Sequence, residues 1–277
     1  MSEGILPEEY AAFCRFLEDA CGIVLGDNKH YLVASRLKRL QEELSISSIS
    51  ALLNHLKSDR SGVLRAKIVD AMTTNETYWF RDQQPFAMLQ ELIFPELIEK
   101  KPRKIRIWSA ACSSGQEPYS ISMTYLEAVA TKMRNPPELE IVGTDISPTM
   151  VKACAAGLYD DLALSRGLSP ERKARFFTQE GKLWRVKKEV SAPIRFVEFN
   201  LMKSYASLAK FDVIFCRNVL IYFSAEAKMD IIKRMGDSLA PHGYFFLGGS
   251  ESMANYSSSF DTVRHKTGLG YRLKQKS

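Results

Sequence analysis

The pattern of hydrophobic and polar positions changes once along the chain. Up to about residue 74, apolar residues recur at helical spacing, separated by short polar segments. Pro7 opens the first expected helix, Gly22 follows its end, and Asp27 or Asn28 can cap a second that carries apolar residues from Tyr31 to Leu44. Two shorter helices are expected at Ala51–Leu56 and Val63–Met72. Residues 1–74 are therefore predicted to form an all-α amino-terminal domain.

From residue 75 to 277 the pattern alternates between short β-branched runs and amphipathic helices. The expected strands are Ile105–Ala110, Glu140–Thr144, Ile194–Phe199, Phe211–Phe215 and Tyr244–Leu247. The expected helices are Phe86–Glu99, Pro118–Met133, Pro148–Ala156 and Ala225–Leu239. Such alternation predicts an α/β fold with a mostly parallel sheet covered on both faces. The closing GYRLKQK is too short for another crossover and should return as an antiparallel strand.

One segment interrupts this alternation. RFFTQEGKLWRVKKEV, residues 175–190, has strand-like flanks around a polar turn that contains Gly181. It predicts a small β-hairpin, inserted as a subdomain over about residues 172–193.

Composition narrows the class of protein. At 277 residues with 45% hydrophobic content, the chain can bury a sizeable core. No apolar run approaches the roughly 20 residues that span a bilayer, and the first residues do not resemble a secretory signal, so we expect a cytoplasmic protein. Its five cysteines form no CxxC pair, which suits reduced thiols. Its four histidines are scattered, and we expect no metal.

The positive charge is local. Residues 166–195 hold nine Lys or Arg and three acids, an excess of six that equals the net charge of +6 of the whole chain. An acidic protein partner or a nucleic acid would account for this segment, and a solvated face that favours solubility accounts for it equally well.

The segment IRIWSAACSSGQEPYSISM, residues 105–123, predicts a buried strand, a turn and a helix start. Ser113, Ser114 and Gly115 let the backbone turn closely around a ligand, and Pro118 suits the first helical turn. Neither GxGxxG nor GxxxxGK[ST] occurs, so no pyrophosphate or triphosphate site is indicated. Glu117 at the helix start would repel a phosphate. A ligand with hydroxyl groups and a positive charge fits, which favours S-adenosylmethionine over NAD or ATP.

Further polar residues follow successive strands and should meet at the same edge of the sheet. They are Asp145, Asn200 with Leu201, and Arg217 with Asn218 and Tyr222, joined by Asn75, Thr77 and Arg81 in the connector between the domains. Each has an ordinary structural alternative, such as a helix cap, a turn residue or, for the run Tyr78–Phe80, a core plug. Their occurrence together after successive strands favours a binding site.

In this order the motifs TNETYWFRD, IRIWSAACSSGQEPYS, IVGTDIS, FVEFNL, FDVIFCRNVLIYF and GGSE resemble those of the CheR-type chemoreceptor glutamate methyltransferases. The resemblance covers nearly the whole chain. It implies a Rossmann-like methyltransferase domain that binds S-adenosylmethionine and releases S-adenosylhomocysteine. It further implies methylation of glutamates on the cytoplasmic helical domain of bacterial chemoreceptors. The one departure is GGSE, where the family pattern leads us to expect histidine at Gly249.

The resemblance also assigns roles. It implies cofactor contacts for Asn75, Thr77, Arg81, Glu117, Asp145, Asn200, Leu201, Arg217 and Asn218, and it places Arg81 and Tyr222 nearest the reacting carboxylate. A glutamate side chain, with a pKa of about 4.3, is already an anionic nucleophile at neutral pH and needs no general base. Because both charges vanish during the reaction, Arg81 is better suited to orienting the carboxylate than to stabilising the transition state.

The resemblance suggests that the helix from Lys29 to Leu44 contacts the receptor, because Lys29, Arg36, Lys38 and Arg39 place cations on or near its exposed side. The alternative is a solvated helix with an Arg39–Glu43 pair. The hairpin turn TQEGK is short, so we expect no need of a receptor carboxyl-terminal tail peptide. We also expect a monomer. Two competing functions are a nucleic-acid methyltransferase and a noncatalytic module that senses the cofactor. Residues 1–80 have nine Lys or Arg against eleven acids, which argues against a continuous nucleic-acid track.

Overall fold

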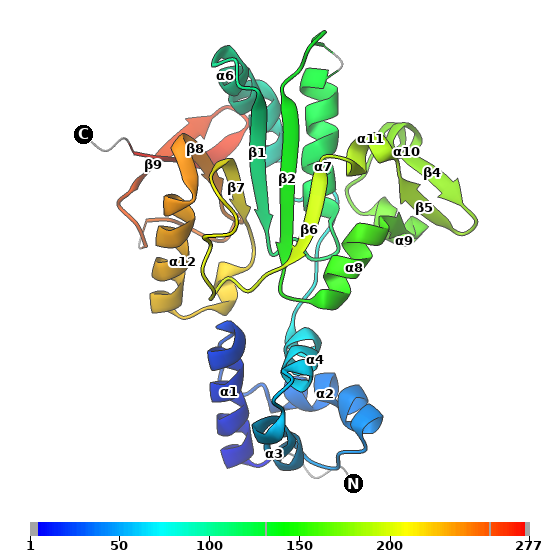
Figure 1. The fold of residues 1–277 in the computed structure, drawn as a ribbon, viewed down its shortest axis with the longest axis vertical. Helices are drawn as coiled ribbons and strands as arrows, with labels where there is room; N and C mark the ends of the chain where they lie inside the picture. The colour runs from blue at the N-terminus through cyan, green and yellow to red at the C-terminus, as the bar shows by residue number, and fades with distance from the viewer. Residues whose placement is uncertain (1–4, 131, 255, 275–277) are drawn as a thin grey trace.

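The computed structural model describes residues 5–130, 132–254 and 256–274. A bundle of helices packs below a larger α/β domain (Figure 1). The bundle consists of α1 (Pro7–Cys21), α2 (His30–Leu44), α3 (Ile49–Ser58) and α4 (Val63–Met72). The predicted helices are confirmed, and Gly22 ends α1 with φ of 78°. The predicted cap of α2 is wrong, because Lys29 occupies the N-cap position and no side chain caps this helix, whereas Asp27 and Asn28 lie outside it.

The α/β domain is built on a seven-stranded sheet of order β6-β2-β1-β7-β8-β10-β9. Its strands are β1 (Lys104–Ala110), β2 (Glu138–Asp145), β6 (Ile194–Glu198), β7 (Phe211–Cys216), β8 (Leu239–Phe246), β9 (Phe260–His265) and β10 (Gly268–Leu273). The five from β6 to β8 are parallel, as predicted.

The end of the sheet is partly as predicted. β10 runs antiparallel to β8, which confirms the expected last strand, although residues 275 and 276 of that segment lie outside the described residues. The edge strand β9, antiparallel to β10, was not predicted.

The expected helices are present with local changes. The first consists of α5 (Gln84–Met88), the π-helical turn η1 (Leu89–Ile93) and α6 (Phe94–Glu99). The second consists of α7 (Gln116–Tyr125) and the π-helical turn η2 (Leu126–Ala130), and residue 131 of the predicted helix is outside the described residues. α8 (Pro148–Ala156) and α12 (Ala225–Asp237) agree with prediction. The 3-10 turn η3 (Leu220–Tyr222) follows β7.

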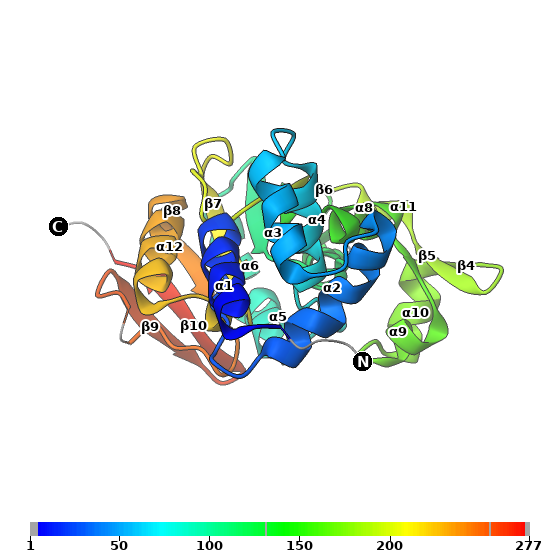
Figure 2. The same ribbon diagram turned by 90° about the horizontal axis from the view of Figure 1, so that it is seen from below.

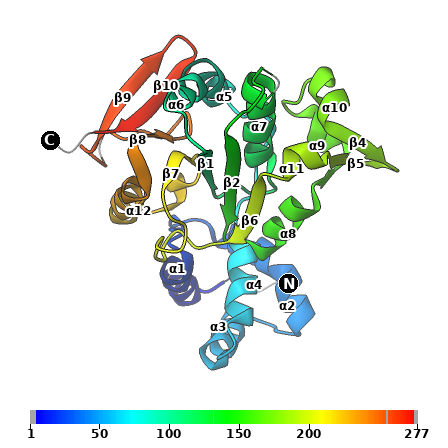
Figure 3. The same ribbon diagram turned by 45° about the horizontal axis from the view of Figure 1, so that its top comes forward.

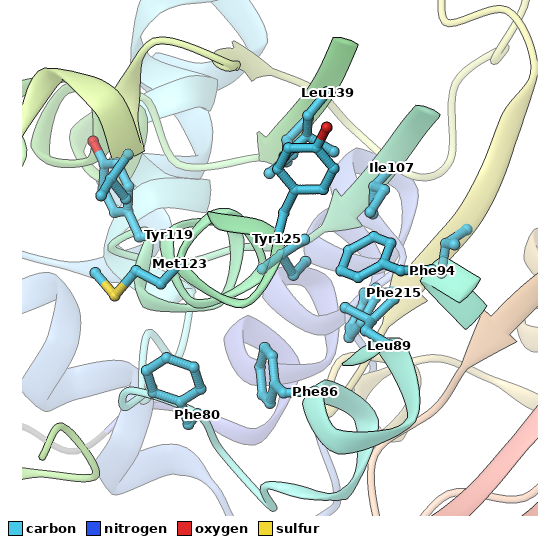
Figure 4. Packing of buried hydrophobic residues seen from close by; sticks show 14 of the residues in the cluster. Phe80, Phe86, Leu89, Phe94, Ile107, Tyr119, Met123, Tyr125, Leu139 and Phe215 are labelled. Carbon is cyan, nitrogen blue, oxygen red and sulfur yellow. The ribbon is translucent and has the colours of Figure 1, made fainter. Parts of the chain in front are cut away.

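The central strands β1, β2 and β7 are buried on both faces, and alternate residues of each strand contribute to opposite sides of the sheet. On β1, Ile105 and Ile107 join one hydrophobic cluster while Trp108 and Ala110 join the other. The first cluster packs α5–α7 against the sheet, and Figure 4 shows its aromatic rings, including those of Phe86, Phe94 and Phe215, arranged around α7. The second lies under α12. A third cluster fills the helical bundle.

The inserted subdomain is larger than predicted. The hairpin of β4 (Phe177–Glu180) and β5 (Leu183–Val186) is confirmed, but β3 (Leu158–Tyr159) adds a third antiparallel strand. Three short helices surround it, α9 (Asp161–Ser165), α10 (Pro170–Phe176) and α11 (Lys188–Ser191), so the ends of the predicted hairpin segment are helical. In Figure 3 this subdomain projects beyond β6, on the side opposite β9 and β10.

The helical bundle lies across the carboxyl ends of the parallel strands, as seen from below in Figure 2. Asp70 at the end of α4 accepts hydrogen bonds from Ser147 and, at 2.6 Å, from Thr149 at the start of α8. Val24 N donates to Tyr222 O at 2.8 Å. The edge of the sheet that carries the candidate residues is therefore covered by a second domain. Within the described chain, no helix is long and apolar enough to cross a membrane.

Candidate functional site

A cavity of about 350 Å³ lies between the helical bundle and the carboxyl edge of the sheet, a size typical of small-molecule sites. The structure brings every predicted site residue to its wall: Asn75, Thr77, Arg81, Glu117, Asp145, Asn200, Leu201, Arg217, Asn218 and Tyr222. The ordinary alternatives to a site, weighed residue by residue, do not explain why all of them line one cavity.

The loop between β1 and α7 forms part of this wall in an unusual backbone conformation. Ala111 and Ser113 have φ of 53° and 52°, a region that side chains other than glycine seldom occupy. Gly115 has φ of 94°, and a Cβ there would lie 3.1 Å from Cys154 Sγ. Glycine is therefore required at the start of α7, and the loop turns its backbone toward the cavity as the sequence predicted.

Asp145 at the end of β2 holds this loop. Its Oδ2 accepts from Ser113 N at 2.8 Å and its Oδ1 accepts from Ser147 N at 2.9 Å. Burial raises the pKa of the Asp145 carboxyl, and these two backbone hydrogen bonds act in the opposite direction. Each carboxylate oxygen keeps a further lone pair, so Asp145 can still accept hydrogen bonds from ligand hydroxyls.

Arg217 is the central charge of the site, with a side chain only 1% exposed. It bonds Glu117 Oε2 at 2.9 Å, Asp82 Oδ2 at 2.6 Å and Arg81 O at 2.8 Å. Ser109 Oγ donates to the other oxygen of Glu117 at 2.7 Å. Because Arg217 neutralises much of the Glu117 charge, Glu117 repels a phosphate less strongly than an unpaired carboxylate would.

The connector between the domains is held from both sides. Ser113 Oγ donates to Asn75 O at 2.9 Å, and Arg81 Nη1 donates to Glu76 O at 3.1 Å. Trp79 is fully buried, and its Nε1 donates to Ala163 O in the inserted subdomain at 3.1 Å. Trp79 and Phe80 of the aromatic run are thus core residues, whereas Tyr78 is only partly buried, and this packing fixes the neighbouring residues that face the cavity.

Asn200 joins the two domains. Its Nδ2 donates to Ala20 O at the end of α1 at 2.9 Å, and its Oδ1 accepts from Met202 N at 2.9 Å. One N–H and one lone pair remain for an adenine edge. A contact of Asn200 with the ligand, as predicted, would therefore come in addition to its role in joining the two domains.

Several residues of the cavity wall were missed by sequence reasoning. Cys21 and Val24 of the helical domain line the cavity, as do Lys29 and Arg36, which the sequence placed at the receptor surface instead. Asp82, the second partner of Arg217, was also missed. Periodicity cannot reveal these positions, because it indicates which residues face the bundle core but not which of the others face a second domain.

The wall suits S-adenosylmethionine. Besides Asp145, it includes the apolar Phe199 and Leu201 and also Asn218, whose buried Oδ1 has no hydrogen-bond partner in the part of the chain that the structure describes. An unpaired buried acceptor requires a donor, such as a hydroxyl, an ammonium or water. Among the described residues no group of three or more His, Cys, Asp and Glu side chains is placed to hold a metal ion.

Comparison with known proteins identifies the family. Residues 8–73 match the model of the CheR methyltransferase all-alpha domain, and residues 75–269 match that of the CheR methyltransferase SAM binding domain. The chain is 51% identical over 271 residues to chemotaxis protein methyltransferase 1 of Vibrio cholerae, covering 98% of each chain. It is 50% identical over 269 residues to chemotaxis protein methyltransferase 1 of Pseudomonas aeruginosa, covering 96% of this chain and 98% of that one.

A more distant relative, the chemotaxis protein methyltransferase of Listeria monocytogenes, is 31% identical over 250 residues, which cover 90% of this chain and 92% of its own. The similarity thus extends over both domains. The resemblance suggested by the motifs is confirmed, and the chain belongs to the CheR family of S-adenosylmethionine-binding chemotaxis protein methyltransferases.

Proposed function

We propose that this chain transfers the methyl group of S-adenosylmethionine to glutamate carboxylates of bacterial chemoreceptors, forming methyl esters for chemotaxis adaptation. The proposal is carried by the family match, which spans both domains, together with the position of the assigned residues. Every residue that the motifs assign to the site lines one cavity between these domains. A receptor with a cytoplasmic helical domain places the enzyme in the cytoplasm.

The cofactor would be held by residues from five segments of the wall. They are Asn75, Thr77 and Arg81 from the connector, Glu117 from α7, Asp145 from β2, and Asn200, Leu201, Arg217 and Asn218 from the loops after β6 and β7. When bound, S-adenosylmethionine supplies an electrophilic methyl group on a positively charged sulfur. The wall offers carboxylates and apolar side chains beside its cations, so it accommodates such a group without any phosphate cradle.

The residues beside the cavity orient the nucleophile instead of activating it. An ionised glutamate needs no base, so the reaction requires in-line placement and exclusion of water. Arg81 lies at the wall with its guanidinium 5.5 Å from the centre of the Tyr78 ring, and its main-chain carbonyl is tied to Arg217. Its planar fork can align a carboxylate, while Tyr222 and the helical domain cover the cavity.

We propose that α2 contacts the receptor through Lys38 and Arg39, which are exposed. Arg36, expected on the exposed side, instead bonds the end of α4 through Thr73 O at 3.0 Å and Thr74 Oγ1 at 2.8 Å. The alternative interpretation of this helix paired Glu43 with Arg39, but Glu43 forms its ion pair with Lys67 of α4. Lys38 and Arg39 therefore remain the cations of α2 best placed to meet acidic receptor helices.

The basic segment contributes less free charge than its composition indicates. Ion pairs engage five of its cations, at Arg166, Arg172, Lys173, Arg185 and Arg195. This pairing weakens the case for a nucleic-acid methyltransferase, since phosphate binding requires cations free to replace counterions.

One experiment separates the three candidate functions. The purified protein is incubated with S-adenosylmethionine labelled in the methyl group, together with receptor cytoplasmic fragments, with RNA, or with neither. We expect base-labile label on the receptor fragments only. Label on RNA would support the nucleic-acid alternative, and cofactor binding without transfer to either would support a sensing module.

A further inference from the structure

Glu251 lies outside the cavity wall but touches a residue that forms it. It belongs to the GGSE segment that follows β8, the strand beside β7 in the sheet. Its Oε2 accepts from Asn218 N at 2.7 Å and from Gly248 N at 2.8 Å. One carboxylate oxygen therefore joins the loops at the carboxyl ends of two adjacent strands.

The backbone of Asn218 needs such a partner. Its φ of 58° lies in the left-handed region, which asparagine tolerates better than most residues but which still costs free energy. A hydrogen bond from its N–H to a carboxylate is charge-assisted and therefore stronger than one to a neutral acceptor. Glu251 thus stabilises the conformation in which the side chain of Asn218 lies at the cavity.

Glycine at position 248 makes this approach possible. A Cβ there would lie 2.6 Å from Asn218 Nδ2 and 2.8 Å from Glu251 Oε2, closer than side chains can pack. Glu251 N also donates to Gly248 O at 2.9 Å, which closes the turn and fixes where the carboxylate starts. Gly249 is different, since a Cβ there would meet only Asp82 Oδ2 at 3.9 Å.

The conformation of Asn218 also controls the residues that follow. Val219 and Tyr222 line the cavity, and the 3-10 turn η3, which ends at Tyr222, begins at Leu220, two residues after Asn218. Asn218 Oδ1, Glu251 Oε1 and Arg217 Nε are buried and have no hydrogen-bond partner among the described residues. Burying polar atoms without hydrogen-bond partners costs free energy. A cluster that retains them is typical of a site that is organised before its ligand binds.

We propose that Glu251 is a positioning residue for methyl transfer, which holds the Asn218 backbone in its left-handed conformation and so sets the cavity-facing side chains of Asn218 and Tyr222. The inference rests on the proposed function for the reaction but concerns the geometry of the cofactor cavity. Nothing in this role requires Glu251 to touch either substrate.

The test compares three substitutions at Glu251. Glu251→Gln keeps an oxygen that can accept both N–H groups, whereas Glu251→Ala removes it. We expect the alanine variant to raise both the KM for S-adenosylmethionine and the Kd for S-adenosylhomocysteine at least about tenfold, and the glutamine variant to stay within about threefold of the native protein. A role in folding alone would reduce the amount of active enzyme without changing either constant.

Glu138→Ala is the matched control, because it removes a carboxylate that pairs with Lys104 at 3.2 Å near the opposite end of the sheet. If the alanine variant does not fold, Glu251→Asp applies the same test, since it keeps the charge but shortens the reach. An unchanged Kd in the alanine or aspartate variant would overturn the proposal, as would a glutamine variant as weak as alanine. Calorimetry with S-adenosylhomocysteine needs no receptor, so a protein that binds it but methylates no receptor would contradict only the proposed function.

Discussion

Asp145 and Arg217 are buried charged residues of the cavity. They differ in how far hydrogen bonds within the protein already compensate their charge. Arg217 bonds two carboxylates and a carbonyl, so its charge is largely compensated within the protein. Among the described residues, the hydrogen-bond partners of Asp145 are backbone N–H groups, and burial raises the pKa of its carboxyl. At the scale of single residues, Asp145 is therefore the acid best placed to gain from a ligand's donors.

Asp145→Ala is expected to weaken binding of S-adenosylhomocysteine at least about tenfold, roughly 1.4 kcal/mol, because hydrogen bonds to ribose hydroxyls and the support of Ser113 are both lost. Titration calorimetry measures the change. Asp160→Ala is a suitable control, since Asp160 also follows a strand and caps a helix, accepting from Ala163 N at 2.7 Å, but does not line the cavity. Unchanged affinity at Asp145 would remove it from the site.

Arg81→Lys tests orientation by a planar fork. Lysine keeps the charge but loses two-point geometry, so methyl transfer should fall at least about tenfold while the fold persists. Arg166→Lys is the control, because Arg166 lies over the same Tyr78 ring at 5.5 Å and pairs with Glu76 but is not at the cavity wall. Initial rates at saturating cofactor decide the matter, and near-normal turnover of the Arg81 variant would show that charge alone suffices.

At the scale of elements, the central strands β1 and β2 are joined by charge as well as by backbone. Glu140 on β2 bonds Arg106 at 2.9 Å and Lys104 at 3.1 Å, both on β1. The hydrogen bond from Arg106, with a smaller contribution from that of Lys104, lowers the pKa of the Glu140 carboxyl to about 2. Burial acts in the opposite direction but does not outweigh these hydrogen bonds. The unfolded carboxyl titrates near 4.3.

This shift has a defined pH dependence. A carboxyl whose pKa is lower in the folded state stabilises the fold above its unfolded pKa, and this contribution is lost as the pH falls toward the folded pKa. Glu140→Gln should therefore lower the melting temperature at pH 7, with a difference from the native protein that shrinks between about pH 4.3 and pH 2. Thermal melts across this range provide the check, with the more exposed Glu138→Gln as control. A difference independent of pH would contradict the assignment.

The elements that were predicted and those that were missed differ in how much they depend on local sequence. The central parallel strands β1, β2 and β7 were predicted because both of their faces are buried and their apolar runs are continuous. β9 was missed because its residues Asp261, Thr262 and Arg264 are exposed, so its sequence FDTVRH has little apolar signal. The three turns of helix around the inserted hairpin were missed because each is only four to seven residues long, too short for a period to be visible.

At the scale of the whole molecule, the site depends on contacts that no local pattern contains. The motif residues after each strand could be predicted to meet, since parallel strands end at one edge. That a helical domain covers this edge, with Lys29 and Arg36 at the cavity wall, follows from tertiary contacts alone. The pairing of Glu117 with Arg217, 100 residues apart, was likewise invisible in the sequence.

Receptor recognition is a property of the whole molecule. The turn between β4 and β5 is short, and a Cβ at Gly181 would meet nothing, so this hairpin is a tight turn exposed to solvent. We expect the protein to methylate a receptor equally well with and without its last few residues, and to bind the isolated tail peptide weakly. A large loss on truncation, or tight peptide binding, would show that a tail is used.

If docking relies on α2 instead, the rate should fall as salt rises, because exposed charges are screened within about 10 Å at 0.1 M ionic strength. Lys38→Glu should lower the kcat/KM for the receptor several-fold at low salt, with a smaller effect at high salt. Lys233→Glu on the exposed side of α12 is the matched charge reversal and should change little. Equal effects of the two variants would remove α2 from the docking surface.

The strand β9 also has a consequence for how copies of this protein behave toward one another. It forms one edge of the sheet, where unpaired backbone groups could add a strand from a neighbouring molecule. Asp261 and Arg264 are exposed along it, and Lys274 lies 3.8 Å from Asp261. Charges placed along an edge strand oppose aggregation because a second strand would have to bury them. Closing the sheet with a polar hairpin thus disfavours self-association of a largely apolar sheet, which agrees with the monomer expected from the sequence.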